Sequence, residues 1–536
     1  MFIILIFALV MVLLVVVSVI AYRTAYHGDV ATDEKALAPY ANDISVFTKK
    51  PKRVYFPRTT RDVSTLVRQT LEDREDGKPV SLTVRAGGTC MSGGPLTEDS
   101  VVDMTRYMTE VSIDPAAQTA TVEMGAYFRD IEDAAAKHGL MFAPYPSSRR
   151  ICGIGGMIGN NASGEKSVRF GATGDNVLDM EVVLADGSVV NVGPKSVKVA
   201  TDAREQAILN LATKYKDSLA AATGDVKKAA SGYRLEKVLK DDTFNEIPLF
   251  AGAQGTLGII TKATLKLLPI PEHLSLLVVS AERLEDIPII VNDIFRFNPE
   301  AVETFDINTF NKAREHLSEH ANRALPYVVE NAKIFILAEF SEPTREGTDR
   351  QAAQCFSVLE EHGYVVRQVV DETDISSIWE VRRNSFLLMR DHNPVGYKAV
   401  PCIEDVIVPV PALTEFIGEL NAILNRRNIK YGFHGHIGDG SLRIVPVFKV
   451  DSPTLIDDIT GLMVEVFALI KRLRGNISAD HSDGIIRSPF LRDFYGEELT
   501  SVFAEIKRIY DPQNIMNPGK KVAVSVRDID TYFDRG

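Results

Sequence analysis

The hydrophobic pattern separates an apolar N-terminal run from a long mixed remainder. Residues 2–22 are apolar apart from Ser18 and the closing Tyr22. A helix of this length spans roughly 30 Å, which matches the hydrocarbon core of a bilayer. Basic residues follow the run, starting at Arg23, and none precedes it. The pattern predicts a single-pass cell-membrane anchor at residues 1–22 with the rest of the chain on the cytoplasmic side. A cleaved signal peptide is the alternative, although a basic leader is missing.

After a tether at residues 23–45, short elements alternate up to a boundary near Pro269 and Pro271. The periodicity predicts strands at 80–85 and 119–124, a helix at 127–138, a strand–turn–strand at 180–192, a helix at 203–221, and a glycine-rich stretch at 250–268 that becomes β-branched. Gly139 is a typical helix stop, and Asp186-Gly187 is a typical hairpin turn. We assign these elements to a first domain at residues 46–272.

A second domain, at residues 273–480, repeats strand and helix patterns. Strands are predicted at 274–280, 301–307, 333–339, 364–370, 403–408, 430–433 and 442–447, and helices at 284–297, 344–362, 375–389 and 455–474. This texture predicts an α+β fold with an antiparallel sheet. A C-terminal segment, residues 481–536, contains one further helix at 497–510, and we expect it to return to the first domain.

Composition narrows the function classes. The net charge is −12, which disfavours nucleic-acid binding because that role needs a basic face. The four cysteines, Cys90, Cys152, Cys355 and Cys402, are widely spaced. A disulfide scaffold or an iron–sulfur cluster held by this chain alone is therefore not expected.

Three glycine clusters lie in the first domain, at residues 85–94, 152–164 and 252–260. Clustered glycines let backbone N–H groups converge on phosphate oxygens without obstruction by Cβ atoms. Each cluster alone could be a simple turn, but together they favour a dinucleotide. A nicotinamide fingerprint fits badly, because Ile158 stands where the third glycine belongs.

These segments resemble the vanillyl-alcohol oxidase / p-cresol methylhydroxylase flavoprotein family. The matching segments are Arg85-Ala-Gly-Gly-Thr-Cys-Met-Ser-Gly-Gly94, Asn160-Asn-Ala-Ser-Gly164 with Arg169-Phe-Gly171, and Gly255-Thr-Leu-Gly-Ile-Ile260. Later segments resemble the branch with D-lactate dehydrogenase, D-2-hydroxyglutarate dehydrogenase and the FAD-binding component of glycolate oxidase. They are Gly435-His-Ile-Gly-Asp-Gly-Ser-Leu-Arg443, Asp480-His-Ser-Asp-Gly484 and Asn517-Pro-Gly-Lys520.

The resemblance implies a two-part FAD-binding domain and an α+β substrate cap domain. It places FAD against Arg85, Gly87, Gly88, Thr89, Cys90, Ser92, Gly93, Gly94, Pro146, Ser147, Gly155, Gly156, Asn160, Ala162, Ser163, Gly164, Gly255, Gly258, Ile259, Ile260 and Asn517. Some family members attach FAD through a histidine of the first loop. This loop has none, so we expect non-covalent FAD.

The expected chemistry is oxidation of a 2-hydroxy acid, which needs a carboxylate clamp, a base and a hydride acceptor. Arg382 matches the family's Trp-x-x-Arg segment, and its guanidinium suits a carboxylate; a helix-surface arginine is the alternative. The resemblance makes His481 the base, and His436 and Asp480 ligands of a divalent metal such as zinc or manganese.

Arg443 stands where the family has a second histidine ligand. An arginine cannot ligate a metal, and its charge would repel one. We therefore expect the metal to be lost or weakened, with Arg443 stabilising the alkoxide or a second substrate anion. A solvent-facing strand residue is the alternative for Arg443.

The sequence thus predicts a membrane-anchored FAD-dependent dehydrogenase that oxidises a small anionic D-2-hydroxy acid by hydride transfer to flavin N5. Electrons would leave to a quinone, a cytochrome or an iron–sulfur partner. Alternatives are an oxidase, a transferase of the alkylglycerone-phosphate synthase type, and an FAD-binding protein that has lost catalysis.

Overall fold

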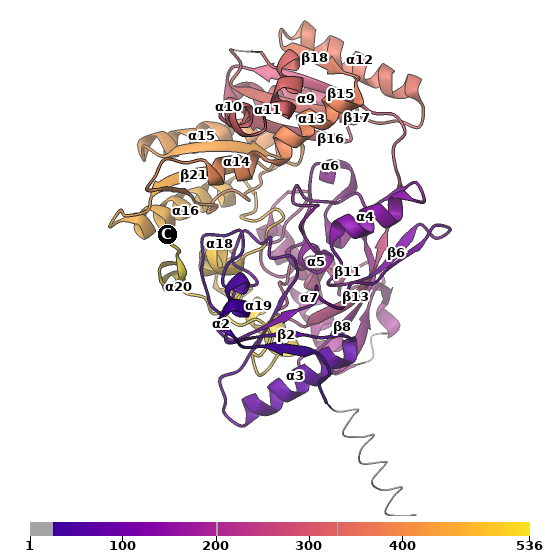
Figure 1. Cartoon of the computed structure of the whole chain (residues 1–536), viewed down its shortest axis with the longest axis vertical. Helices are drawn as coiled ribbons and strands as arrows, with labels where there is room; N and C mark the ends of the chain where they lie inside the picture. Colours follow the sequence, from indigo (N-terminus) through magenta and orange to yellow (C-terminus); the bar gives the residue numbers. More distant parts are fainter. Residues whose placement is uncertain (1–24, 200–201, 330, 536) are drawn as a thin grey trace, which may run out of the picture.

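The computed structural model describes residues 25–199, 202–329 and 331–535. Figure 1 shows a lower lobe formed by the first half of the chain and an upper lobe formed by the second, with the C-terminal helices against the lower lobe. The anchor predicted at residues 1–22 lies outside the described residues. Within the described part, no helix has both the length and the apolar character needed to cross a membrane.

The lower lobe begins with a four-stranded sheet. Its order is β1 (Asp29–Ala31), β2 (Arg53–Phe56), β4 (Ser100–Asp103) and β3 (Leu82–Arg85), and the last three strands are parallel. Helix α3 (Thr60–Glu75) connects β2 to β3. The Thr59 hydroxyl caps it by accepting from the Asp62 N–H, and buried Val63, Leu66 and Val67 form its apolar stripe. Strand β3 confirms the prediction at 80–85 and delivers Arg85 to the first glycine loop.

A five-stranded antiparallel sheet completes the walls of the lower lobe. Its order is β5 (Val111–Asp114), β6 (Thr119–Glu123), β13 (Ile259–Lys266), β8 (Val177–Val183) and β9 (Val189–Val192). The predicted hairpin is confirmed, with Gly187 at φ 77° in its turn. Helix α4 (Phe128–Ala136) stops before Gly139, which has φ 68°. The long helix α7 (Ala203–Thr223) confirms the helix predicted at 203–221. Smaller elements are α2 (Glu34–Leu37), β7 (Leu140–Met141), α5 (Ile154–Asn160), α6 (Ser167–Phe170), β10 (Lys195–Ser196), β11 (Leu239–Lys240), β12 (Thr243–Phe244), α8 (Ile247–Phe250) and β14 (Leu268–Pro269).

The upper lobe contains a seven-stranded sheet that is antiparallel throughout, as predicted. Its order is β18 (Val365–Val369), β15 (Ser275–Ala281), β17 (Ile334–Phe340), β16 (Ala301–Asp306), β20 (Lys430–Gly435), β21 (Arg443–Lys449) and β19 (Tyr397–Ala399). The helices are α9 (Ile287–Phe295), α10 (Ile307–His316), α11 (Ser318–Ala324), α12 (Arg345–Glu361), α13 (Glu372–Arg383), α14 (Ser385–Asp391), α15 (Leu413–Arg426) and α16 (Leu455–Arg472).

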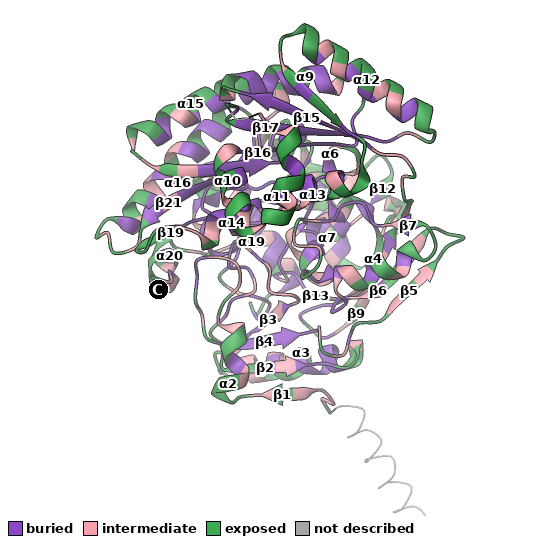
Figure 2. Ribbon diagram, turned by 45° about the horizontal axis from the view of Figure 1, so that its top comes forward, coloured by how far each residue is buried: buried purple, intermediate pink, exposed green. Residues whose placement is uncertain are grey.

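Both faces of this sheet are covered, which explains why β15, β17 and β16 are buried along their whole length. Leu276 and Val278 of β15 pack in one core with Trp379 of α13, whereas Leu277 and Val279 belong to the other core. Successive side chains of a strand point to opposite faces, so β15 supplies both cores. Figure 2 shows the sheet as buried and the outer helices α12, α15 and α16 as alternating buried and exposed positions.

Two predictions in the upper lobe are wrong. Residues 403–408 are not a strand, and the edge of the sheet is β19 instead. Ile407 makes only isolated bridges to Ser441 and Asn476, so this buried segment follows an irregular path. The helix predicted at 375–389 is two helices, because the chain leaves helical geometry at Asn384, whose amide side chain donates to the Glu380 carbonyl.

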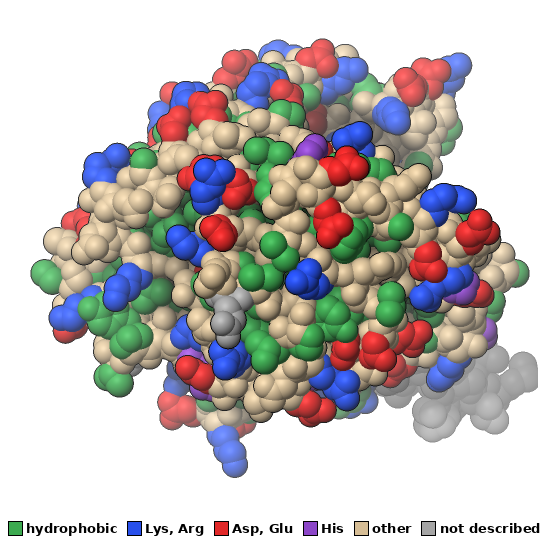
Figure 3. Space-filling view, turned by 90° about the horizontal axis from the view of Figure 1, so that it is seen from above, with side chains coloured by type: hydrophobic (Ala, Val, Ile, Leu, Met, Phe, Trp, Pro, Cys, Tyr) green, Lys and Arg blue, Asp and Glu red, His purple; other side chains and the backbone are tan. Residues whose placement is uncertain are grey.

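The C-terminal segment runs back along the lower lobe. It contains α17 (Gly484–Arg487), α18 (Leu491–Tyr495), α19 (Glu497–Tyr510) and α20 (Val526–Tyr532). The Leu82 N–H donates to the Ile515 carbonyl at 2.8 Å, and the Asn517 N–H donates to the Leu82 carbonyl at 2.8 Å. This chain segment therefore lies beside β3, and Figure 1 shows the helices α18 and α19 against the lower lobe. Figure 3 shows acidic and basic side chains interspersed on the face seen from above.

Candidate active site

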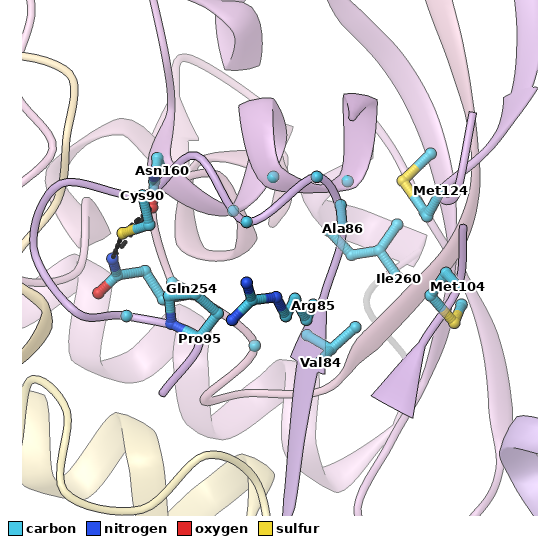
Figure 4. A pocket seen from close by; sticks show the side chains of 18 of the residues that line it. Val84, Arg85, Ala86, Cys90, Pro95, Met104, Met124, Asn160, Gln254 and Ile260 are labelled. Atoms are coloured by element: carbon cyan, nitrogen blue, oxygen red, sulfur yellow. Dashed lines mark hydrogen bonds between the residues drawn. The ribbon is translucent and has the colours of Figure 1, made fainter. Parts of the chain in front are cut away.

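The three glycine loops surround one cavity in the lower lobe. It encloses about 810 Å³ and lies between the end of β3, helix α5 and the turn before β13. The predicted cofactor residues that line it are Arg85, Gly87, Gly88, Thr89, Cys90, Gly94, Gly155, Gly156, Asn160, Gly255, Gly258 and Ile260. Figure 4 shows Cys90, Asn160 and Gln254 together at one end of this cavity, with Met104, Met124 and Ile260 grouped at the other. Loops from residues 85 to 260 thus converge on a single space.

Glycine is required where these loops approach one another. A Cβ atom on Gly87 would stand 2.4 Å from the Ile151 carbonyl oxygen, and one on Gly155 would stand 2.7 Å from that of Met124. No side chain fits at either contact, so these residues keep the backbone of the loops close to the cavity. A dinucleotide fits this cradle because its diphosphate needs close backbone approach.

Gln254 ties the cavity wall together, and it was not among the residues predicted from the sequence. Its side-chain amide donates to Ser92 Oγ at 3.1 Å and to Asn160 Oδ1 at 3.0 Å, and it accepts from the Gly484 N–H at 2.8 Å. Its carbonyl accepts from Asn517 Nδ2 at 2.7 Å. One residue therefore joins all three cavity loops and the C-terminal segment. Gln254 is a polar side chain within a glycine cluster, so the sequence pattern could have indicated it.

A second cavity of about 1350 Å³ lies between the two lobes, and Thr89, Gly156 and Asn160 line both cavities. Its other predicted residues are Pro146, Ser147, Ala162, Ser163, Arg382, His436, Arg443, Asp480 and His481. Every predicted catalytic residue thus faces one space that adjoins the nucleotide cavity. Arg382 is 2% exposed and Arg443 is 4% exposed, so the surface alternatives for both arginines are wrong.

Five predicted cofactor residues lie behind the cavity walls: Ser92, Gly93, Gly164, Ile259 and Asn517. Ser92 Oγ donates to the His481 carbonyl at 3.1 Å, and Asn517 Nδ2 donates to the Gly94 carbonyl at 3.0 Å. These two side chains hold the lining segments in place. His434 lines the second cavity, and its Nδ1 has no hydrogen-bond partner among the described residues.

Comparison with known proteins agrees with this geometry. Residues 51–193 match the family described as FAD binding domain, and residues 270–521 match FAD linked oxidases, C-terminal domain. The chain therefore carries an FAD binding domain and the C-terminal domain of FAD linked oxidases.

The chain is similar to D-2-hydroxyglutarate dehydrogenase of Haemophilus influenzae, which is 28% identical over 92% of this chain and 50% of its own length. The glycolate oxidase subunit GlcD of Bacillus subtilis is 27% identical over 90% and 91% of the two chains. The chain therefore spans about half the length of the dehydrogenase relatives but nearly all of GlcD.

Two solved structures share the fold. p-Cresol methylhydroxylase with substrate bound superimposes with a TM-score of 0.66 at 16% identity, covering 93% of this chain and 94% of its own. Alkyldihydroxyacetonephosphate synthase gives 0.62 at 15%, covering 92% and 82%. The fold of this chain is thus the two-domain p-cresol methylhydroxylase type, which confirms the predicted fold family.

His481 lies between an acid and an arginine. His481 Nδ1 is 3.0 Å from Glu404 Oε1, and His481 Nε2 is 2.8 Å from Arg443 Nη1. Because a guanidinium only donates, Nε2 accepts from Arg443 and Nδ1 carries the hydrogen that points to Glu404. Burial raises the pKa of Glu404, but the charges and hydrogen bonds of Arg487 and His481 together outweigh burial and lower that pKa. Glu404 is thus a carboxylate that orients the imidazole of His481.

His436 and Arg382 share a second buried acid, Glu303. His436 Nδ1 is 2.7 Å from Glu303 Oε1, and Arg382 Nη2 donates to Glu303 Oε2. Burial raises the pKa of Glu303 to about 8 and lowers the pKa of His436 well below its usual range. His436 is therefore neutral at pH 7. The Arg382 Nε atom is buried and has no hydrogen-bond partner among the described residues.

Three further charged residues of the site, Glu404, Glu303 and Lys228, were not predicted from the sequence. Glu404 stands beside Asp405 in an otherwise apolar stretch, and Glu303 interrupts an apolar strand. Buried acids in such places signal a site, so both were detectable. Lys228 follows Lys227 in a polar segment, where nothing local distinguishes it from a surface lysine.

Proposed function

We propose that this chain is an FAD-dependent dehydrogenase of a small D-2-hydroxy acid. The observation that carries the proposal is the convergence of Arg382, His436, Arg443 and His481 on one cavity that adjoins the nucleotide cavity. Relatives named D-2-hydroxyglutarate dehydrogenase and glycolate oxidase subunit GlcD support this class of substrate.

Arg382 is the proposed partner of the substrate carboxylate. Its guanidinium is buried in the cavity wall and keeps one unused donor at Nε. Glu303 holds the other side of the guanidinium and so orients it. A buried, pre-oriented arginine binds a carboxylate more strongly than a mobile one because less side-chain entropy is lost.

His481 Nε2 is the proposed base. In the proposed step Arg443 Nη1 moves its hydrogen bond from Nε2 to the substrate oxygen, which frees the Nε2 lone pair. As the substrate O–H bond breaks, its proton passes to Nε2, and Glu404 stabilises the resulting imidazolium through Nδ1. Arg443 Nη1 lies beside Nε2 and can donate to the oxygen that loses the proton. Bound FAD supplies the acceptor for the hydride that leaves C2, so the product is the 2-oxo acid.

Membrane anchoring and the electron acceptor are further parts of the proposal. The apolar run at residues 2–22 supports a single-pass anchor with the enzyme on the cytoplasmic side. An anchored dehydrogenase would pass electrons to a quinone, or to a cytochrome or iron–sulfur partner.

Anaerobic flavin reduction tests the function. Purified protein reconstituted with FAD is mixed with D-lactate, glycolate, D-2-hydroxyglutarate and malate, and loss of the oxidised-flavin absorbance is followed. We expect one acid to bleach the flavin rapidly and the His481→Ala variant to bleach at least about 100-fold more slowly. Bleaching by none of these acids, despite bound FAD, would refute the proposal and leave the transferase or a non-catalytic FAD protein. Equal rates in both proteins would remove His481 from the mechanism.

A further inference from the structure

Both oxygens of the Asp480 carboxylate are already held by cations. Arg443 Nη2 donates to Asp480 Oδ1, and Lys228 Nζ donates to Asp480 Oδ2 at 3.3 Å. Ser163 Oγ also donates to Oδ2, at 2.7 Å. Asp480 is 1% exposed, so water does not compete for these contacts.

The Lys228 ammonium lies among oxygen atoms of the kind that bind a hard cation. Four oxygens surround Nζ: Ser163 Oγ at 2.6 Å, Ser167 Oγ at 3.0 Å, Asp439 Oδ2 at 3.0 Å and Asp480 Oδ2 at 3.3 Å. Lys228 is 2% exposed. Two carboxylates and two hydroxyls are an oxygen set of the kind that binds divalent ions, yet here they enclose an ammonium.

The Arg443 guanidinium occupies the space between the other potential metal ligands. Among the described residues, Asp405, Asp480 and His481 bring potential ligand atoms within 4.8 Å of one another. The Arg443 guanidinium reaches all three, with Nη1 at 2.8 Å from His481 Nε2 and at 3.7 Å from Asp405 Oδ1, and Nη2 on Asp480. The imidazole lone pair and the carboxylate oxygens that a metal needs are therefore occupied. The residues present do not fit a divalent ion.

We propose that Lys228 and Arg443 together replace the divalent metal expected from the family resemblance, so that the site works without one. Arg443 touches the reacting region, since its Nη1 lies beside the proposed base. Lys228 is a positioning residue: it lies outside the cavity lining and acts through Asp480 and Ser163, both of which line the cavity. The inference rests on the proposed function for its chemistry but on contacts alone for the absence of a metal.

Arg443 and Lys228 supply positive charges whose positions are fixed by their contacts. An arginine fork directed at the substrate oxygen favours the developing alkoxide, as a metal ion would, and remains charged at every physiological pH. Because Lys228 neutralises the second oxygen of Asp480, the carboxylate does not draw Arg443 out of the cavity. The arrangement needs no ion uptake and resists chelators.

The first test uses the wild-type holoprotein. Metal content is measured after purification, and flavin reduction by the active acid is measured before and after dialysis against a chelator. We expect far fewer than one ion per chain and a rate that changes less than about two-fold, since no step depends on a metal. About one tightly bound ion per chain, removed by the chelator together with flavin reduction, would overturn the inference. Failure of every acid to reduce the flavin would instead refute the proposed function, and the metal count would still decide the present question.

The second test removes the two cationic side chains, one in each variant. Arg443→His removes the fork and adds an imidazole, and Lys228→Met removes the ammonium from its oxygen cage. We expect each variant to gain a Mn²⁺- or Zn²⁺-dependent rise in melting temperature that wild type lacks, with about one ion bound per chain in Arg443→His. Lys507→Met is the matched control, because Lys507 also pairs with a buried aspartate, Asp511, outside the cavities. The control loses stability without gaining a metal response.

A folded Arg443→His variant that ignores both ions would show that the cations do not occupy a latent metal site. If that variant does not fold, Arg443→Lys, which keeps the charge and is expected to remain metal-free, and Lys228→Met still decide the matter. A metal response in Lys507→Met equal to that in Lys228→Met would also contradict the inference.

Discussion

Replacing Glu404 by glutamine tests how the proposed base is oriented. The Glu404 carboxylate accepts from His481 Nδ1 at 3.0 Å and from Arg487 Nη2 at 2.5 Å, and it is fully buried. A glutamine keeps the volume but presents an amide N–H₂ group on one side. Because His481 Nδ1 and Arg487 Nη2 share Oε1, the amide oxygen can take that place, and the N–H₂ group then replaces Oε2, which has no hydrogen-bond partner among the described residues. The variant therefore keeps the hydrogen bond to Nδ1 but removes the negative charge that stabilises the imidazolium formed when Nε2 takes the substrate proton.

The magnitude follows from these contacts. General-base catalysis contributes about 10²- to 10⁴-fold to a rate, so weakening the base by removing its carboxylate charge should lower flavin reduction at saturating acid by at least about 10-fold in Glu404→Gln. Stability should also fall, by about 3 kcal/mol, because Arg487 is fully buried and loses its carboxylate partner. Stopped-flow absorbance under anaerobic conditions measures the rate, and thermal unfolding measures the stability.

A control separates orientation from general damage. Glu415→Gln removes a carboxylate that pairs with Arg472 at the surface of α15, and it should change neither quantity appreciably. The double variant Glu404→Gln with His481→Ala should be no slower than His481→Ala alone, because both changes disable one group. A Glu404→Gln protein that binds FAD and reduces it within about three-fold of the wild-type rate would refute this reasoning.

Three further predictions concern binding and stability. Arg382→Lys should raise the acid concentration that half-saturates flavin reduction by about 10- to 100-fold, since a point charge replaces a fork; an unchanged value would exclude Arg382 as the carboxylate partner. Gln254→Leu should weaken FAD binding by at least about 10-fold in a fluorescence titration, because buried donors and acceptors of three segments lose their partner; unchanged affinity would count against Gln254 as the wall anchor. Burial lowers the pKa of Lys520 to about 7. Above pH 7 the unfolded chain therefore binds a proton at this residue that the folded chain does not, and the free energy of unfolding rises with pH until about 10.5. In Lys520→Met, the rise in the free energy of unfolding between pH 7 and 9, measured by urea unfolding, should be smaller by about 1 to 3 kcal/mol; the same rise as in wild type would contradict the assignment.

Local pattern was sufficient for most of the elements. The strands β3, β6 and β15 and the helix α4 were predicted because alternation and glycine stops act within a few residues. The glycine loops and the histidines His436 and His481 were found for the same reason, since each lies in a short recognisable segment.

Only the tertiary structure decided how these pieces work together. Lys228 and Asp480 are 252 positions apart, and Glu404 reaches His481 across 77 positions. No periodicity records such pairings, because they depend on how the two lobes and the returning C-terminal segment pack. The same packing overrode the strand pattern at residues 403–408, whose irregular path brings Glu404 to His481. The sequence alone identifies which types of residue are present in each segment. The contact partners, burial and charge balance of these residues depend on the packing of segments that are distant in the sequence.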